Sequence, residues 1–269
     1  MEKEILTMEE AAELFSVSVK TFIKLLKEEK VPARKIGREW RFSRQALINW
    51  LSVGDSQQYS ASEGEAKDFF NDVASKWEEL RQDYYDESIK NKLIDLDIIN
   101  NNMLVVDLGA GDGYISREVS KIAQKVIAVD ISGEMLKELQ KKASDEGIKN
   151  IETVESDGLD VPVPEACGDV VCASMYLHHI ADPEMAIKEM KRILKPGGKV
   201  FLADYNEHSD KELVEKMHDI WQGFSEDDLK MWFKASGFKK VRIEKLAGRT
   251  RKSGKSIPGA GIFILTAEK

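Results

Sequence analysis

The segment LVVDLGAGDG, residues 104–113, constrains the fold of this chain more than any other stretch. An apolar run of strand length contains an acid, Asp107, and leads into a turn with glycines at 109, 111 and 113. Glycine lacks a Cβ atom and tolerates positive φ, so this turn can reverse sharply and let a ligand approach the backbone. The pattern therefore predicts a buried strand, a ligand-binding turn and then a helix.

The rest of the chain after this turn alternates between strand-like and helix-like segments. We expect strands at 103–109, 125–132, 151–157, 169–175 and 199–205, with helices at 114–123, 133–147 and 183–194. A helical region then continues to Ala235, and two more strands, 239–246 and 261–269, are joined by the loop 247–260. Such alternation predicts an α/β protein with a mostly parallel sheet and helices on both of its faces.

Two further acids lie at the ends of predicted strands. Asp130 ends the strand 125–132, about 20 residues after the glycine turn, where it can accept hydrogen bonds from ribose hydroxyls. Asp157 comes directly after the strand residues IETVES, where an adenine amine would need an acceptor. A single acid of this kind is often only a turn residue or a helix cap, but three acids in register with the glycines indicate a ligand site. The spacing is not the G-x-G-x-x-G of dinucleotide sites, and an opening carboxylate suits a cationic ligand.

Residues 103–204 resemble the class I, Rossmann-like methyltransferases that use S-adenosylmethionine (SAM), especially those acting on small molecules. VVDLGAGDGYIS is similar to the first motif of that family, and AVDISGEML is similar to the second. The resemblance implies a Rossmann-like, seven-stranded, mostly parallel sheet with flanking helices. It also implies the following cofactor-binding residues: Asp107, Gly109, Gly111, Gly113, Asp130, Ile131, Met135, Asp157, Gly158 and Ser174.

The amino-terminal segment has a different charge from the remainder of the chain. Nine Lys/Arg residues and three acids lie between Val17 and Leu51, although the whole chain has a formal net charge of −8. Thr7 is placed to cap a short helix, a second helix follows from Val19, and 32–43 can form a hairpin before a third helix from Arg44. Two helices joined by a tight turn and followed by a basic hairpin predict a small winged helix-turn-helix domain.

Residues 5–51 resemble the excisionase and MerR-type DNA-binding domains. The resemblance implies that Ser18, Lys20, Thr21 and Lys24 face the major groove, and that Arg34, Lys35, Arg38 and Arg41 reach the DNA backbone or minor groove. We expect a homodimer, because one module of this size gives little affinity for an operator. The alternative is that the basic residues are a solvated face of a domain used for dimerisation or substrate gating.

The polar run 52–65 predicts a linker between a domain at 1–51 and a domain at 66–269. Beyond it, residues 69–98 show helical periodicity, with Phe69, Val73, Trp77 and Leu80 on one face. We expect this region to supply a lid over the ligand site, or equally an ordinary part of the core. The lid candidates are Trp77, Arg81, Tyr84 and Tyr85.

The methyl acceptor is less defined than the cofactor. The motifs of DNA base methylation are absent after the strand 169–175, so a small-molecule acceptor is the favoured hypothesis. His178, His179 and His208 are candidate general bases, since histidine titrates near neutrality, but each can equally be a packing or capping residue. Cys167 and Cys172 raise arsenite as an acceptor, but Cys172 is expected in the core and a third thiol is missing. We expect no metal.

The favoured function is SAM-dependent methyl transfer to a small molecule by a protein that also binds DNA. Residues 203–238 are similar to the carboxy-terminal part of fusions between an arsenic-repressor-type domain and a methyltransferase. The alternatives are a transcription regulator that senses SAM or S-adenosylhomocysteine without turnover, and a helix-turn-helix kept only for dimerisation. The two cysteines and the lack of a signal-peptide pattern or a long apolar stretch predict a cytoplasmic protein without a membrane partner.

Overall fold

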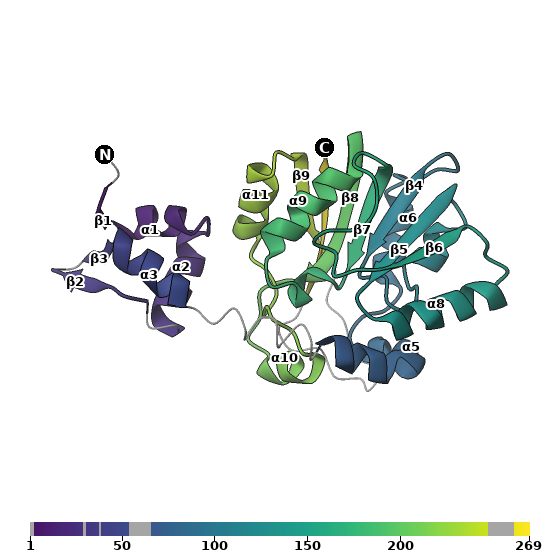
Figure 1. The fold of residues 1–269 in the computed structure, drawn as a ribbon, viewed down its shortest axis with the longest axis horizontal. Helices are drawn as coiled ribbons and strands as arrows, with labels where there is room; N and C mark the ends of the chain where they lie inside the picture. Colours follow the sequence, from purple (N-terminus) through teal and green to yellow (C-terminus); the bar gives the residue numbers. More distant parts are fainter. Residues whose placement is uncertain (1–2, 29–30, 38, 54–65, 247–260) are drawn as a thin grey trace.

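The computed structural model describes residues 3–28, 31–37, 39–53, 66–246 and 261–269. Seven strands form the larger of two sheets, in the order β6-β5-β4-β7-β8-β10-β9 (Figure 1). The four pairings from β6 to β8 are parallel, whereas β10 is antiparallel to both of its neighbours. The strands are β4 (Leu104–Leu108), β5 (Lys125–Asp130), β6 (Ile151–Glu155), β7 (Gly168–Ser174), β8 (Leu194–Tyr205), β9 (Lys239–Lys245) and β10 (Ile262–Glu268). The predicted Rossmann-like, mostly parallel sheet is confirmed.

The central strands of this sheet are buried on both faces. Val106 and Leu108 of β4 belong to one hydrophobic cluster, while Val105 belongs to the cluster on the other face. In β7, Val171 and Cys172 likewise lie in different clusters, as side chains of neighbouring strand residues point to opposite faces. This explains why β4 and β7 read as continuous apolar runs, which is typical of parallel strands covered by helices on both sides.

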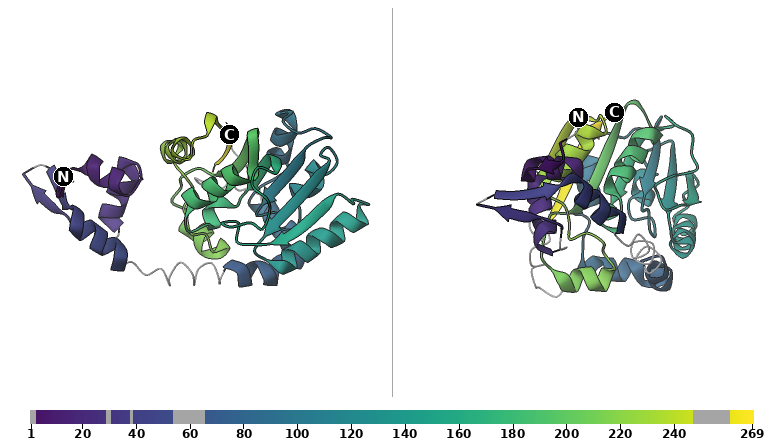
Figure 2. Two further views of the ribbon diagram at one scale, coloured as in Figure 1. Left: turned by 45° about the horizontal axis from the view of Figure 1, so that its top comes forward. Right: turned by 60° about the vertical axis from the view of Figure 1, so that its left-hand side comes forward.

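Helices cover both faces of the sheet (Figures 1 and 2). The core on one face includes side chains of α9 (Pro183–Ile193) and α11 (Glu226–Ala235). The core on the other face includes side chains of α6 (Ser88–Asp95), α7 (Ser116–Val119), α8 (Gly133–Asp145) and α10 (Lys211–Met217). Most of these helices begin with a side chain that accepts from a free backbone N–H: Ser132, Asp182, Asp210 and Ser225 cap α8, α9, α10 and α11.

The region 66–98 differs from the single helical face expected for it. It is helical at 66–73, passes through 3₁₀ turns at Ala74–Lys76 and Arg81–Asp83 around α5 (Trp77–Leu80), and resumes as α6. A 3₁₀ turn has three residues per turn, so each one shifts the buried face away from the 3.6-residue period. Consequently Trp77 is buried but Leu80 is 38% exposed, and the assignment of Leu80 to the buried face was wrong.

The amino-terminal unit has the predicted helix-turn-helix and hairpin. A second sheet of order β1-β3-β2 accompanies three helices, and Phe22, Phe42 and Leu47 form the centre of its core. Thr7 and Glu10 form a capping box at the start of α1, as the predicted capping role of Thr7 requires. The elements are β1 (Ile5–Leu6), α1 (Met8–Leu14), α2 (Val19–Glu28), β2 (Arg34–Ile36), β3 (Glu39–Ser43) and α3 (Arg44–Val53).

Three sequence-based expectations lie wholly or largely outside the described residues. These are the linker 52–65, of which 54–65 are not described, the loop 247–260 and the role of Arg38. Among the residues that are described, no helix combines the length and apolar character needed to cross a membrane.

Candidate functional site

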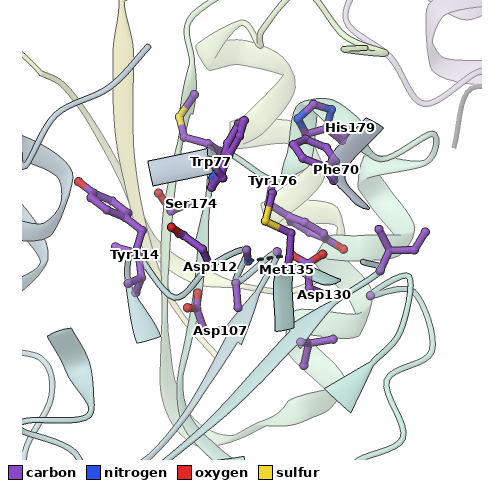
Figure 3. Close-up of a pocket in the computed structure, with 18 of the residues that line it drawn as sticks. Phe70, Trp77, Asp107, Asp112, Tyr114, Asp130, Met135, Ser174, Tyr176 and His179 are labelled. Atoms are coloured by element: carbon purple, nitrogen blue, oxygen red, sulfur yellow. Dashed lines mark hydrogen bonds between the residues drawn. The ribbon is translucent and has the colours of Figure 1, made fainter. Parts of the chain in front are cut away.

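A pocket opens at the carboxyl ends of the parallel strands, beside the glycine turn that follows β4 (Figure 3). Of the ten predicted cofactor residues, nine line this pocket: Asp107, Gly109, Gly111, Asp130, Ile131, Met135, Asp157, Gly158 and Ser174. They come from the ends of four different strands, from the turns after them and, for Met135, from the first turn of α8. The strand order therefore brings together residues that are up to 67 positions apart in the sequence, from Asp107 to Ser174.

Asp130 holds the glycine turn in place. One of its carboxylate oxygens accepts from the Gly111 backbone N–H at 2.8 Å, and the other accepts from Ser132 N–H at 2.9 Å. Burial raises the pKa of Asp130 to about 6, even though these hydrogen bonds favour its ionised form. Each oxygen has a further lone pair, so Asp130 can still accept hydrogen bonds from a ligand in the pocket.

Four other polar side chains of the pocket carry buried atoms without a hydrogen-bond partner. They are Asp107 Oδ1, Asp112 Oδ1, Ser174 Oγ and His179 Nδ1. Asp107 uses its second oxygen to accept from Ser116 Oγ at 2.6 Å, and burial raises its pKa to about 7. Buried polar atoms are nearly always hydrogen-bonded, so unpartnered acceptors along one pocket wall indicate a site for a ligand with donors. The sequence had pointed to Asp107 and Ser174 but not to Asp112.

The glycines at 109 and 113 serve different purposes. A Cβ atom on Gly109, whose φ is +68°, would lie 2.6 Å from Cδ2 of Tyr176, a pocket residue. At Gly113, whose φ is +92°, a Cβ atom would instead lie 2.8 Å from Cγ of Leu139 in α8. Gly113 does not line the pocket, so its predicted ligand contact stays a prediction. It is required because the turn packs closely against α8.

Aromatic side chains make up much of the pocket wall. Trp77 and Tyr85, two of the four lid candidates, line it, whereas Arg81 and Tyr84 do not. The guanidinium of Arg81 is buried and lies 4.3 Å from the ring centre of Tyr114, so it supports an aromatic residue of the wall. The sequence reading missed Phe70, Tyr114 and Tyr176, which are pocket residues without a spacing signal of their own.

Only one of the three candidate histidines touches the pocket. His179 lines it, with its ring 5.1 Å from that of Phe70. His178 is buried behind the wall, where its Nδ1 lies 2.6 Å from Asp204 Oδ1. His208 lies outside the pocket lining, and its Nδ1 accepts from the Asp210 backbone. A general-base role for His178 or His208 is therefore not supported, since neither reaches the space where an acceptor would bind.

The predicted DNA-facing residues of α2 contact the larger unit. The Ser18 backbone N–H and the Thr21 hydroxyl both donate to the Asp228 carboxylate, at 3.1 and 2.6 Å. Lys20 forms an ion pair with Glu207, and Trp232 Nε1 donates to the Ser16 carbonyl at 3.3 Å. In the hairpin, Arg34 and Lys35 are exposed and Arg41 pairs with Glu39, while Lys24 is half-buried in α2.

Comparison with protein families identifies the two units. Residues 106–202 match a family model described as a methyltransferase domain, and residues 5–52 match one described as a helix-turn-helix domain. The chain thus combines a helix-turn-helix domain with a methyltransferase domain of Rossmann-like fold.

Similar curated proteins include the ubiquinone/menaquinone biosynthesis C-methyltransferase UbiE of Shewanella frigidimarina. It is 28% identical over 162 residues, which is 57% of this chain and 64% of that protein. The UbiE protein of Pseudomonas paraeruginosa is 29% identical over 160 residues, covering 56% of this chain and 62% of that protein. The chain therefore matches slightly less than two thirds of the length of these curated relatives.

Solved structures show the same fold at low sequence identity. A SAM-dependent methyltransferase of Thermotoga maritima, a possible histamine N-methyltransferase, has a TM-score of 0.59 at 19% identity, covering 76% of this chain and 99% of that one. The Bacillus subtilis protein YcgJ has a TM-score of 0.58 at 18% identity, covering 68% and 99%. A Haemonchus contortus N-methyltransferase, solved with S-adenosylhomocysteine, has a TM-score of 0.58 at 18% identity, covering 68% and 52%.

Proposed function

We propose that this protein is a SAM-dependent methyltransferase that acts on a small molecule and binds DNA through its helix-turn-helix domain. The observation that carries the proposal is the set of acceptors around the glycine turn: Asp107, Asp112, Asp130 and Ser174. We further propose the domain limits 1–51 and 66–269 with a linker at 52–65, a homodimer, and a cytoplasmic location. The two cysteines, Cys167 and Cys172, are free thiols, which agrees with a reducing compartment.

The chemistry of the pocket fits SAM. The ammonium group of SAM can donate hydrogen bonds to Asp107 Oδ1 and Ser174 Oγ, which have no partner in the protein. The two hydroxyls of the ribose can donate to the free lone pairs of Asp130. Ile131 and Met135 offer apolar contacts for an adenine ring, and Asp157 lies beside Gly158 at the same end of the pocket. The excess of carboxylates over cations in the lining suits a ligand with a sulfonium and an ammonium.

When bound, SAM supplies a methyl group that passes from the sulfonium to a nucleophilic atom of the acceptor, which loses a proton. The contribution of the chain is to position the two reactants and exclude water. Trp77 lies over Gly111, with its Nε1 3.7 Å from where a Cβ atom of that glycine would be, and it covers the pocket from the side of the helical region. His179 is the one candidate histidine in the pocket lining, and burial lowers its pKa, so its ring is neutral and disfavours taking up a proton.

The acceptor is expected to be apolar and aromatic. Phe70, Trp77, Tyr85 and Tyr114 give the pocket wall flat apolar surfaces on which an aromatic ring can stack. Because the curated relatives are named as ubiquinone/menaquinone biosynthesis methyltransferases, phenols and quinols are the first acceptors to test.

The test is transfer of an isotope-labelled methyl group from SAM to a cell metabolite extract and to a panel of phenols, quinols and thiols. The proposal expects a labelled small molecule with the wild-type chain and none with Asp130→Ala. Asp227→Asn is a control, because Asp227 is an exposed acid of α11 outside the pocket. Labelling of DNA in place of any small molecule, or equal labelling by Asp130→Ala, would contradict the proposal.

The contact between α2 and α11 favours a second candidate function, a transcription regulator that responds to the bound cofactor. The Asp228 carboxylate accepts hydrogen bonds from Ser18 and Thr21, and Glu207 pairs with Lys20. These carboxylates therefore bind the groups that would otherwise contact DNA phosphates. The contact also reaches the pocket wall. Trp232 packs against Trp221, whose Nε1 donates to the carbonyl of Ile180, a residue of the pocket lining.

This candidate is tested by the salt-dependent affinity for promoter DNA with and without S-adenosylhomocysteine. Asp228→Asn weakens the contact with α2, so tighter DNA binding is expected, whereas Asp227→Asn removes the same charge one residue away and is the matched control. A regulator would show a ligand-dependent shift in DNA affinity without turnover on the acceptor panel. A DNA affinity that neither the ligand nor Asp228→Asn changes would exclude the regulator function. If the chain shows no salt-dependent DNA binding at all, the helix-turn-helix domain serves only for dimerisation.

A further inference from the structure

A buried cluster of two histidines and an aspartate lies directly behind the pocket wall. Nε2 of His178 is 3.5 Å from Oδ1 of Asp219, and Nδ1 of His179 is 3.7 Å from the same oxygen. The three ligand-type atoms lie within 4.8 Å of one another. Nothing in the proposed methyl transfer uses Asp219 or requires His178.

The polar atoms of this cluster lack ordinary partners. Both carboxylate oxygens of Asp219 and Nδ1 of His179 are buried without a hydrogen bond, and the Asp219 side chain is fully buried. A buried carboxylate with neither oxygen satisfied is costly, and a native structure has few of them. An ion between the three side chains would satisfy Nδ1 of His179 and Oδ1 of Asp219.

The surroundings orient the imidazole ring of His178 for this purpose. Nδ1 of His178 lies 2.6 Å from the Asp204 carboxylate, which leaves Nε2 directed toward Asp219. Asp204 is itself fixed, because it accepts the backbone N–H groups of Leu177 and Tyr205 at 2.9 and 2.7 Å. A carboxylate behind a histidine is a frequent companion of metal-ligating imidazoles, since it sets the tautomer and the ring orientation.

The position of Asp219 is also fixed by the backbone. The N–H groups of Ile220 and Trp221 both donate to the His178 carbonyl at 3.0 Å, which ties the chain after Asp219 to the chain that carries the histidines. A tetrahedral zinc ion with bonds of about 2.0–2.2 Å separates its ligand atoms by roughly 3.3–3.6 Å. The two distances to Asp219 Oδ1 are close to that range.

We propose that His178, His179 and Asp219 bind one divalent transition-metal ion, with Zn²⁺ as the best match. Two imidazoles and one carboxylate form a donor set of borderline softness, which suits Zn²⁺ and its close neighbours rather than Mg²⁺ or Ca²⁺. Three protein ligands leave at least one position of the ion open. Because His179 also lines the pocket, the ion lies beside the space in which the methyl acceptor is proposed to bind.

The test uses the full chain without a histidine tag, freed of metal by a chelator and then titrated with Zn²⁺ and with Co²⁺ as a spectroscopic probe. We expect one ion per chain, visible Co²⁺ absorption bands of a low-coordinate site, and a thermal midpoint that rises with added Zn²⁺. Asp219→Asn and His179→Gln are each expected to weaken binding by about 100-fold or more, since each removes one of three ligands. His208→Gln is the matched control, because it removes a buried histidine outside the cluster.

Zn²⁺ that neither binds at one equivalent nor changes the thermal midpoint of the wild-type chain would overturn the proposal, and this result needs no variant. Equal affinity in Asp219→Asn or His179→Gln and in the wild-type chain would also overturn it. In that case the cluster is a protonated His178 between Asp204 and Asp219. The readout is metal binding alone, so it does not depend on whether the protein transfers methyl groups.

Discussion

Replacing Asp107 with asparagine is expected to stabilise the unliganded protein and to weaken its binding of S-adenosylhomocysteine. Burial raises the pKa of Asp107 to about 7, from 3.8 for an unperturbed carboxyl. Because the pKa of Asp107 is higher in the folded protein than in the unfolded chain, its contribution to stability is fully present below pH 3.8. This contribution is lost as the pH rises from 3.8 to about 7. At pH 8 the ionised carboxylate therefore costs up to about 4 kcal/mol, at about 1.4 kcal/mol for each pKa unit.

Asparagine keeps the shape of the side chain but carries no charge, so most of this cost disappears. We expect Asp107→Asn to raise the free energy of unfolding by roughly 1–3 kcal/mol at pH 8, because part of the gain is lost in burying the amide. Binding changes in the opposite direction. Losing a hydrogen bond between an ammonium and a carboxylate costs about 1.5–3 kcal/mol, which weakens the affinity roughly 10- to 100-fold.

The assay combines urea denaturation at pH 8 with calorimetric titration of S-adenosylhomocysteine. Asp182→Asn is the control, because Asp182 only caps α9 and asparagine caps a helix equally well. A variant that is less stable than the wild-type chain, or one that binds the ligand as tightly, would refute the reasoning that Asp107 is kept ionised for a cationic ligand.

Three further predictions follow from the same structure. Gly109→Ala should weaken S-adenosylhomocysteine binding at least about tenfold, because a Cβ at this positive φ lies 2.6 Å from Tyr176; calorimetric affinity equal to the wild type would contradict the close approach. The affinity for this ligand should fall at least about tenfold between pH 8 and pH 5, since the pKa of Asp130 is raised to about 6 and the ligand needs the ionised carboxylate; a flat pH profile would contradict this. Thr7→Ala should lower the unfolding free energy of the helix-turn-helix domain by about 0.5–2 kcal/mol, because it removes the capping box with Glu10. Hydrogen-exchange protection of the domain measures this change, and a smaller change would show that the cap contributes little.

The succession of strands and helices along the chain, and the meeting of Asp107, Asp130 and Asp157 at one pocket, could be predicted from the sequence because they follow from local patterns. Asp107, Asp130 and Asp157 lie at or just beyond the ends of predicted strands, and a parallel sheet brings strand ends together at one edge. The helix-turn-helix domain was predictable for the same reason, since Thr7 marks a helix start and the hairpin follows from the residues of its turn.

Features that depend on packing between distant segments could not be predicted from the sequence. The resemblance gave Gly113 the same role as Gly109, but only the position of α8 shows that a Cβ atom at Gly113 would meet Leu139. The strand β8 begins at Leu194, five residues before the expected start, because Leu194 pairs with Gly168 across the sheet. The link between Asp219 and the histidines joins segments about forty residues apart, and no local pattern announces it.

The expectation for α2 shows a different limit. Lys20 and Thr21 were assigned to a DNA-facing surface from the resemblance of the first fifty residues alone, which carries no information about the second domain. In the structure this surface meets Asp228 and Glu207. Whether DNA replaces these carboxylates is the question that the Asp228→Asn comparison answers.

The central claim is that the pocket at the glycine turn binds SAM, and calorimetric titration of the full chain with S-adenosylhomocysteine tests it most directly. We expect one binding site per chain for the wild type and an affinity at least about 100-fold lower for Asp130→Ala, because that change removes both the ribose acceptor and the support of the Gly111 turn. Absence of binding heat with the wild-type chain across a range of temperatures, or equal binding by a folded Asp130→Ala variant, would contradict it.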